Sequence, residues 1–312
     1  MKLDLNLLKR LLVIDHPSKH EWPMLSAIIN ECYKIGNLYF EMDGYCNIFI
    51  TKNTSNPDFY PCVVAHTDCV IPCEHKKIKM KGNKIVGIDG KTNKRTALGA
   101  DDTNGICCAL QLLKALPDLK VCFTTEEEIG FLGAEYAADN IDFFYNVSYM
   151  IQADRRGNKD LITHTNGIHS ASEAWLQEVS GIMAKYHYSE QYGIGTDIGV
   201  LAEKLQISGV NISCGYSSEH TVNESINVAD LQNCLNFMLE IIKTVPLDKQ
   251  YEIKIEYKPY TRYYDEYYKH YYDDYEPKAL GYDDFPKDDE HLACEHCSTY
   301  DCMNCKIYPD YY

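Results

Sequence analysis

The sequence predicts an α/β protein in which a doubly wound, mostly parallel sheet carries helices on both faces, followed by a C-terminal extension. Two observations support this fold class. Short apolar runs of the kind found in buried strands alternate with longer segments whose apolar residues recur at helical spacing, and this alternation is typical of βαβ units. The chain has 312 residues, of which 45% are hydrophobic, so it can bury a large core.

The expected elements follow from these two patterns. Apolar spacing predicts helices over residues 23–35, 103–115, 131–139, 170–186, 196–205 and 228–245. Apolar or alternating runs predict strands over residues 45–51, 61–65, 119–125, 147–153 and 209–214. In the basic stretch 76–94, Gly82 and Asn83 predict a hairpin, which we interpret as a solvated ribbon rather than as the rim of a site.

The composition of the chain changes near its C-terminal end. We expect a catalytic domain over residues 1–250 and a tyrosine-rich, acidic extension over residues 251–312. The extension holds 15 of the 26 tyrosines, with 15 acidic and 7 basic residues, so half of the net charge of −16 lies in it. Residues 251–258 alternate between apolar and polar types and could add an edge strand.

The negative charge narrows the range of partners. It argues against nucleic acid and against an anionic membrane surface, since both select a basic protein face, and it suits a protein that binds cations. The first 14 residues are too interrupted by charged side chains for a signal peptide, and no apolar run approaches the ~18 residues of a membrane helix. We therefore expect a cytoplasmic protein whose 14 cysteines are mostly reduced.

Side chains of the types that bind metal ions stand beside several expected strands. They are His66, Asp68, Asp101, Asp102, Glu126, Glu127, Glu128, Asp154 and His220. Sites in open α/β sheets collect at the carboxyl ends of the strands, so these side chains are expected to meet there. Imidazole and carboxylate ligands suit divalent ions such as zinc, and a pair of such ions can catalyse a hydrolysis. The ordered set predicts a two-metal hydrolytic site.

Two of these motifs have simple alternatives when each is taken alone. His66 and Asp68 are two residues apart at a strand end, so His66 can bind metal while Asp68 orients its imidazole. The alternative is a histidine that only caps the strand. Asp101 precedes Asp102 at the start of an expected helix and is a natural bridging ligand, although two acids at a helix N-terminus also favour simple capping.

The glutamates at 126–128 follow the apolar strand 119–125 directly. Three adjacent negative charges repel one another unless cations or protons offset them. One glutamate can bind a metal ion while its neighbour acts as the general base toward a water molecule. A solvated acidic loop is the alternative.

The motifs also carry a family resemblance as a set. They are His66-x-Asp68, Gly99-Ala100-Asp101-Asp102-x-x-Gly105, Glu126-Glu127-Glu128-Ile129-Gly130-x-x-Gly133-Ala134, Asp154, Gly195-Thr196-Asp197 and His220-x-x-x-Glu224. Over residues 60–240 this series resembles the co-catalytic zinc exopeptidases, in the order of that family. The branches it resembles most are the glutamyl or deblocking aminopeptidases and the tripeptide aminopeptidase called peptidase T.

The resemblance implies a dinuclear metal centre. One ion would be bound by His66 and Asp154, and the other by Glu128 and His220. Asp101 would bridge the two ions. Zinc is the expected metal, with manganese and cobalt as alternatives for a carboxylate-rich site.

The resemblance also implies a mechanism and a substrate. Glu127 would be the general base, which takes a proton from the bridging water and returns it to the departing amine. Asp68 would orient the first histidine ligand, and the Asp101–Asp102 peptide bond would be cis. Aspartate at the position of Asp154 goes mostly with aminopeptidases and dipeptidases in this family, whereas glutamate goes mostly with carboxypeptidases and deacylases, so we expect an aminopeptidase that acts on short peptides. A dipeptidase, carboxypeptidase or N-acyl amidohydrolase on the same site is the alternative.

The chain departs from this family in one respect. Relatives usually carry an inserted lid or dimerisation domain, and no segment between Cys69 and His220 is long enough for one. Substrate selection and oligomeric state are therefore left open. Tyr216 could donate a hydrogen bond to the oxyanion, or it could simply pack. An inactive metal-binding interaction protein is the alternative from a different class, and the complete ligand set argues against it.

A second set of metal-type residues lies in the extension. Its members form two Cys-x-x-Cys pairs: Cys294, Cys297, Cys302 and Cys305. Four thiolates can enclose a structural zinc ion or an iron–sulfur cluster. The pairs are closer together than in a standard zinc ribbon, so a tail of reduced cysteines is the alternative to a compact zinc knuckle.

Overall fold

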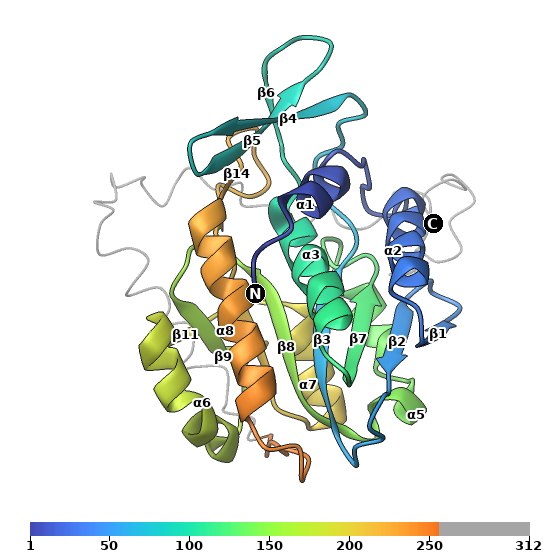
Figure 1. Ribbon diagram of the computed structural model, residues 1–312, viewed down its shortest axis with the longest axis vertical. Helices are drawn as coiled ribbons and strands as arrows, with labels where there is room; N and C mark the ends of the chain where they lie inside the picture. Colours follow the sequence, from blue (N-terminus) through green and yellow to red (C-terminus); the bar gives the residue numbers. More distant parts are fainter. Residues whose placement is uncertain (256–312) are drawn as a thin grey trace, which may run out of the picture. The chain divides into compact units, whose positions relative to one another are not determined.

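The computed structural model describes residues 1–255 of the chain, which fold around two β-sheets (Figure 1). The larger sheet has nine strands in the order β1-β2-β7-β3-β8-β12-β9-β10, with β11 beside β9. These strands are β1 (Leu38–Met42), β2 (Ile48–Lys52), β3 (Tyr60–His66), β7 (Leu119–Thr124), β8 (Val147–Arg155), β9 (Asp160–Thr165), β10 (Ile168–His169), β11 (Ser189–Tyr192) and β12 (Gly209–Ser213). The smaller sheet consists of β4 (Lys76–Lys81), β5 (Lys84–Asp89), β6 (Arg95–Thr96), β13 (Tyr216–Ser217) and β14 (Ser225–Asn227).

The four central strands of the larger sheet, β7, β3, β8 and β12, run parallel to one another. Antiparallel strands flank them, because β2 pairs with β7 on one side and β9 pairs with β12 on the other. The predicted α/β fold with a mixed, largely parallel sheet is confirmed, and its parallel part is the centre. Since parallel strands end at the same edge of a sheet, the carboxyl ends of β3, β7 and β8 lie together.

Helices cover both faces of the larger sheet, as predicted. Side chains alternate along β3, so Val63 and Ala65 join a core with α1, α2, α3, α6 and α8, whereas Cys62 and Val64 join a core with α4, α5 and α7. The helices are α1 (Leu5–Leu12), α2 (Trp22–Ile35), α3 (Ala100–Ala115), α4 (Leu132–Ala137), α5 (Ile141–Phe144), α6 (Glu173–Tyr186), α7 (Asp197–Leu205) and α8 (Val228–Thr244). Figure 1 shows α1, α2, α3 and α8 in front of the sheet and α7 behind it. Among residues 1–255, no helix has the length and apolar character needed to span a membrane.

The helices and strands predicted over residues 23–245 are all present, with small shifts at their ends. The predicted hairpin forms β4 and β5. Our interpretation of this hairpin as a solvated ribbon is wrong for β5, because Ile85 and Val86 are buried and β5 pairs with β14. The ribbon is therefore part of a sheet that also frames the loop between β13 and β14.

The edge strand predicted from residue 251 onward is wrong for residues 251–255. Among the described residues, this segment forms one isolated β-bridge, between Ile207 and Glu252. The segment that receives it is a short link between α7 and β12, so no longer ladder can form. Tyr251 is nevertheless buried, which shows that the packed unit continues past residue 250. The rest of this prediction, residues 256–258, lies outside the described part of the chain.

Candidate metal centre

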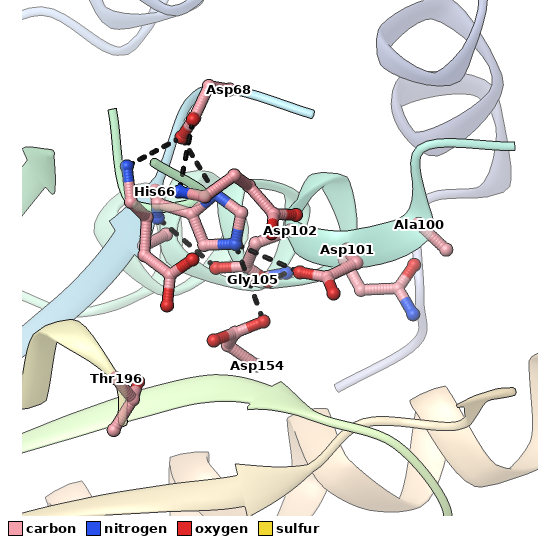
Figure 2. Close-up of polar contacts among 12 residues, drawn as sticks. His66, Asp68, Ala100, Asp101, Asp102, Gly105, Asp154 and Thr196 are labelled. Carbon is pink, nitrogen blue, oxygen red and sulfur yellow. Dashed lines mark hydrogen bonds and ion pairs between the residues drawn. The ribbon is translucent and has the colours of Figure 1, made fainter. Parts of the chain in front are cut away.

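Metal-type side chains gather at the carboxyl ends of the central parallel strands. His66 is the last residue of β3, and Asp154 lies near the end of β8. Glu127 and Glu128 follow β7, and Asp101 stands at the irregular start of α3, before the regular helix. Figure 2 shows the His66 imidazole pointing at the carboxylates of Asp101 and Asp154. The fold thus brings residues from four separate motifs to one place.

The carboxylate of Asp101 lies between two imidazoles. Its Oδ1 is 2.9 Å from Nε2 of His66, and its Oδ2 is 3.3 Å from Nε2 of His220. Asp154 Oδ1 lies 3.5 Å from the same nitrogen of His66. Glu128 Oε1 lies 2.9 Å from Nε2 of His220. The five side chains therefore form two sets of donors that share Asp101.

Asp102 stands close enough to His66 and Asp154 to be considered as a ligand as well. Its carboxylate, however, is already occupied by backbone donors. Oδ2 accepts a hydrogen bond from His66 N at 3.3 Å, and Oδ1 accepts one from Gly105 N at 2.8 Å. Asp101, whose side chain has the two imidazoles as partners, is therefore the better metal ligand. The peptide bond between Asp101 and Asp102 is cis, as the family resemblance implied.

Asp68 connects the first histidine to the glutamates. Its Oδ1 lies 3.2 Å from Nδ1 of His66, so it can orient the imidazole with Nε2 toward the cluster. The same carboxylate accepts hydrogen bonds from Glu127 N at 3.0 Å and Glu128 N at 3.2 Å. Ser18 donates a further hydrogen bond at 2.7 Å. Asp68 thus holds the backbone from which both glutamate side chains project.

The cluster concentrates negative charge in a buried place. Burial raises the pKa values of Glu127, Glu128 and Asp154, and neighbouring carboxylates raise them further. Burial also opposes ionisation of Asp101, but hydrogen bonds from His220 and His66 lower its pKa. Within this cluster the two imidazoles are the only side chains that can become cationic. Four carboxylates and two imidazoles are a donor set that suits divalent cations, whose charge would offset the repulsion.

A cavity of about 340 Å³ opens beside the cluster. Glu127, Glu128 and His220 line one part of it, and Phe131 and Ile162 supply apolar wall. Its volume is sufficient for a small ligand. A substrate bound there would contact the donor cluster directly.

Tyr216 also lines this cavity, and its hydroxyl contacts Asp154. It donates to the backbone oxygen of Asp154 at 3.1 Å and lies 3.3 Å from Oδ1 of the same residue. The tyrosine therefore supports a candidate ligand.

Residues 16–21, near the start of the chain, also contact the cluster. The sequence did not predict these contacts. The buried His16 donates from Nδ1 to the backbone oxygen of Thr67 at 2.8 Å. Burial lowers the pKa of His16 to about 3, so the ring is neutral. Glu21 Oε1 accepts a hydrogen bond from Glu126 N at 3.3 Å. No spacing rule links this loop to motifs so much later in the chain, so these contacts had no sequence signal.

Asp197 is another acidic residue for which the sequence predicted no role. It is fully buried at the start of α7 and accepts a hydrogen bond from Thr124 Oγ1 at 2.5 Å. Burial raises its pKa to about 7, and nearby carboxylates add to the shift. The second predicted metal site, Cys294, Cys297, Cys302 and Cys305, lies outside the described residues.

A metal-dependent peptidase is the class of protein that this fold and donor cluster define. The chain belongs to the peptidase family M20/M25/M40, whose model matches residues 62–244. A search of curated protein sequences finds no match.

Several solved structures share the fold of this chain. An aminopeptidase PepT from Bacillus cereus ATCC 10987 is similar with a TM-score of 0.61 and 16% identity, covering 77% of this chain and 97% of that one. A tripeptidase from Staphylococcus aureus subsp. aureus Mu50 has a TM-score of 0.62 and 16% identity over 77% and 96% of the two chains. An aminopeptidase from the archaeon Desulfurococcus kamchatkensis has a TM-score of 0.60 and 16% identity over 78% and 95%.

Proposed function

We propose that this protein is a dinuclear metallo-aminopeptidase that removes N-terminal residues from short peptides. One observation carries the proposal. The two oxygens of Asp101 face different imidazoles, at 2.9 Å from His66 and 3.3 Å from His220, which is the arrangement expected of a carboxylate that bridges two ions.

In this proposal each ion has three protein ligands. The first ion would be held by His66, Asp154 and Asp101. The second would be held by His220, Glu128 and Asp101. Zinc is the expected metal, with manganese or cobalt as alternatives. Two such ions, when bound, polarise the carbonyl of the scissile bond and lower the pKa of a water molecule.

Glu127 is the proposed general base. Its backbone is anchored by Asp68, its side chain lines the cavity, and it is not needed as a ligand in either donor set. Burial raises the pKa of Glu127, which makes its carboxylate a better proton acceptor. It would take a proton from the attacking water and transfer it to the nitrogen of the departing amine. The peptide bond is then replaced by a carboxylate and a free amine.

The preference for the N-terminal end rests on two points. In the family that the motifs resemble, aspartate at the position of Asp154 is associated with aminopeptidases and dipeptidases, and glutamate there with carboxypeptidases and deacylases. In addition, Glu127 and Glu219 line the cavity and are not metal ligands in this proposal, and they favour a peptide's α-ammonium group, although Glu219 shares its charge with Arg156.

One observation favours a second candidate, a dipeptidase or carboxypeptidase. Arg155 and Arg156 line the same cavity and could bind a peptide carboxylate. Each is paired with an acid, Asp160 or Glu219, which reduces the charge that it offers. The N-terminal preference is therefore the primary proposal.

Peptide trimming tests the proposal directly. The metal-loaded protein is incubated with a mixture of short peptides in three forms: unmodified, N-acetylated and C-terminally amidated. Mass spectrometry then identifies the residue released from each peptide. We expect loss of the N-terminal residue from unmodified and amidated peptides, and no reaction of acetylated ones. Release from the C-terminal end, blocked by amidation, would favour the carboxypeptidase instead.

A further inference from the structure

Asp101 and His220 lie on two loops that hold each other. The Asp101 loop, residues 97–101, runs from the end of β6 through the irregular first residues of α3. The His220 loop, residues 218–224, joins β13 to β14. Both loops leave the smaller sheet, where β14 pairs with residues 84–86 of β5 and β6 pairs with residues 87–88, one after the other along the edge of β5 opposite β4. The relative position of the two loops therefore sets the position of Asp101 relative to His220.

Glu224 holds the Asp101 loop from the end of the His220 loop. Its Oε2 accepts hydrogen bonds from Leu98 N at 2.8 Å and Gly99 N at 2.7 Å. Its Oε1 accepts hydrogen bonds from Ala100 N at 2.8 Å and Asp101 N at 3.2 Å. One carboxylate is thus surrounded by four consecutive backbone donors. Such a concave row of N–H groups, at the start of a helix, is suited to an anion.

The geometry of this loop depends on Gly99. Its φ of +69° is in the left-handed region, which turns the backbone so that neighbouring N–H groups point the same way. The side chain of Glu224 is almost completely buried, so its hydrogen bonds are not exchanged with water. The Asp101 loop and Glu224 are therefore complementary in shape and in charge.

Arg95 makes a second connection, from the strand before the Asp101 loop to the His220 loop. It stands in β6, just before the Asp101 loop, and donates from Nη2 to the backbone oxygen of Glu224 at 2.8 Å. Its Nε donates to the backbone oxygen of Val222 at 3.3 Å. Glu224, from the His220 loop, thus binds the backbone of the Asp101 loop, and Arg95, from the strand before the Asp101 loop, binds the backbone of the His220 loop. This reciprocal clamp consists of Glu224 and Arg95.

The carboxylate of Glu224 carries a cost as well as a benefit. Glu224 lies close enough to Asp101 for their charges to repel, and a second buried acid adds to a site already rich in acids. The four backbone donors offset this cost, and they include the amide of Asp101 itself. The benefit of the carboxylate is that it defines the position of the residue shared by both donor sets.

We propose that Glu224 is a positioning residue, assisted by Arg95, which sets the separation of Asp101 and His220 and thereby forms the site of the second metal ion. The inference rests on the proposed function, since it requires a second ion bound by Asp101, Glu128 and His220. It adds to that function a residue that touches neither metal nor substrate. Partners that orient metal ligands commonly contribute a factor of ~10–100 to metal affinity.

Metal binding to the full chain tests this role without using activity. The metal-free protein is titrated with Co²⁺, and its visible absorption and binding heat resolve the two binding steps. The variants are Glu224→Ala and Glu224→Gln, together with Arg95→Ala. Gln keeps the size of the side chain but turns an N–H₂ group toward backbone donors, so it tests the need for a carboxylate. Ile182→Ala, a core change in α6, is the control for loss of thermal stability.

We expect the affinity for the second Co²⁺ ion to fall by ~10–100-fold in both Glu224 variants and by less in Arg95→Ala. Ile182→Ala should bind Co²⁺ as the unmodified protein does. If Glu224→Ala kept its affinity for the second Co²⁺ ion, or if Ile182→Ala lost as much of that affinity, the proposed role of Glu224 would be wrong. The proposed function would remain intact. Failure of the unmodified protein to bind a second ion would overturn both.

Discussion

At the scale of single residues, the fold gives adjacent acids different surroundings. Asp101 directs its two oxygens to the imidazoles of His66 and His220. Asp102, the next residue, instead accepts hydrogen bonds from backbone N–H groups. A carboxylate already engaged by the backbone is a poor metal ligand, whereas one shared by two imidazoles can bridge two ions. Both residues are aspartates, so residue type alone does not show which of them is available to bind metal.

Proton release should accompany metal binding at His220. Hydrogen bonds to Asp101 and Glu128 raise the pKa of His220 to about 10 in the metal-free protein. At about pH 7 the ring therefore carries a proton, which an ion binding to the same nitrogen must displace. We expect the calorimetric heat of metal binding to depend on the ionisation enthalpy of the buffer, with net proton release.

The sign of this effect follows from the direction of the pKa shift. Because the pKa is raised without metal, release occurs below about pH 10 and disappears above it. His220→Ala should release fewer protons than the unmodified protein. Heats that do not vary with the buffer would contradict His220 as a ligand that is protonated before metal binds.

The candidate site could be predicted only in part. The spacing of His66 and Asp68 at a strand end has a physical meaning that the sequence carries by itself. The contacts of Ser18 and His16 do not, because each joins residues about fifty positions apart through a loop without regular spacing. Side chains that support ligands are set by tertiary packing, which is why the sequence did not reveal them.

At the scale of elements, the predictions were correct for strands whose apolar residues are buried in the core. β3 and β7 are buried along their whole length, so their continuous apolar runs were a reliable signal. β1 was missed because it is an edge strand whose residues are mostly exposed, which leaves no alternation to detect. β9, which pairs with the central strand β12, and β10 and β11, which pair with β9, were missed as well.

Gly133 in α4 fixes the glutamate loop against β7. A methyl group added there would meet the backbone oxygen of Thr125 at 2.1 Å and its nitrogen at 2.5 Å. Neither backbone atom can move without shifting the residues before Glu127. We expect Gly133→Ala to destabilise the fold by about 1–3 kcal/mol, as overpacking usually does, and to weaken metal binding. Denaturant unfolding and a metal titration measure the two effects.

Gly181 provides the matched control for this substitution. It lies within α6, is exposed, and has no atom within 4 Å of an added methyl group. Gly181→Ala should therefore be neutral or stabilise the helix by about 0.5–1 kcal/mol. If both variants behaved alike, the close approach of α4 to β7 would not be what constrains Gly133.

At the scale of the whole molecule, residues 1–255 combine a large sheet with a small one. The large sheet brings His66, Asp154 and the glutamates to one edge, and the small sheet supports the loops that carry Asp101 and His220. The chain keeps this fold at 16% identity to the structures of an aminopeptidase PepT and a tripeptidase. Most side chains can change while the fold persists, so function must be argued from the donor cluster itself.

The most direct test of the account measures metal content and peptide turnover in the same samples of the unmodified protein and Glu127→Gln. Chelation should remove both ions and all turnover from the unmodified protein, and zinc should restore them. Glu127→Gln should bind two ions per chain yet lose turnover by about 10²–10⁴-fold, since it keeps the ligands and lacks the base. Near-normal turnover in Glu127→Gln, or full turnover of the unmodified protein without metal, would contradict the account.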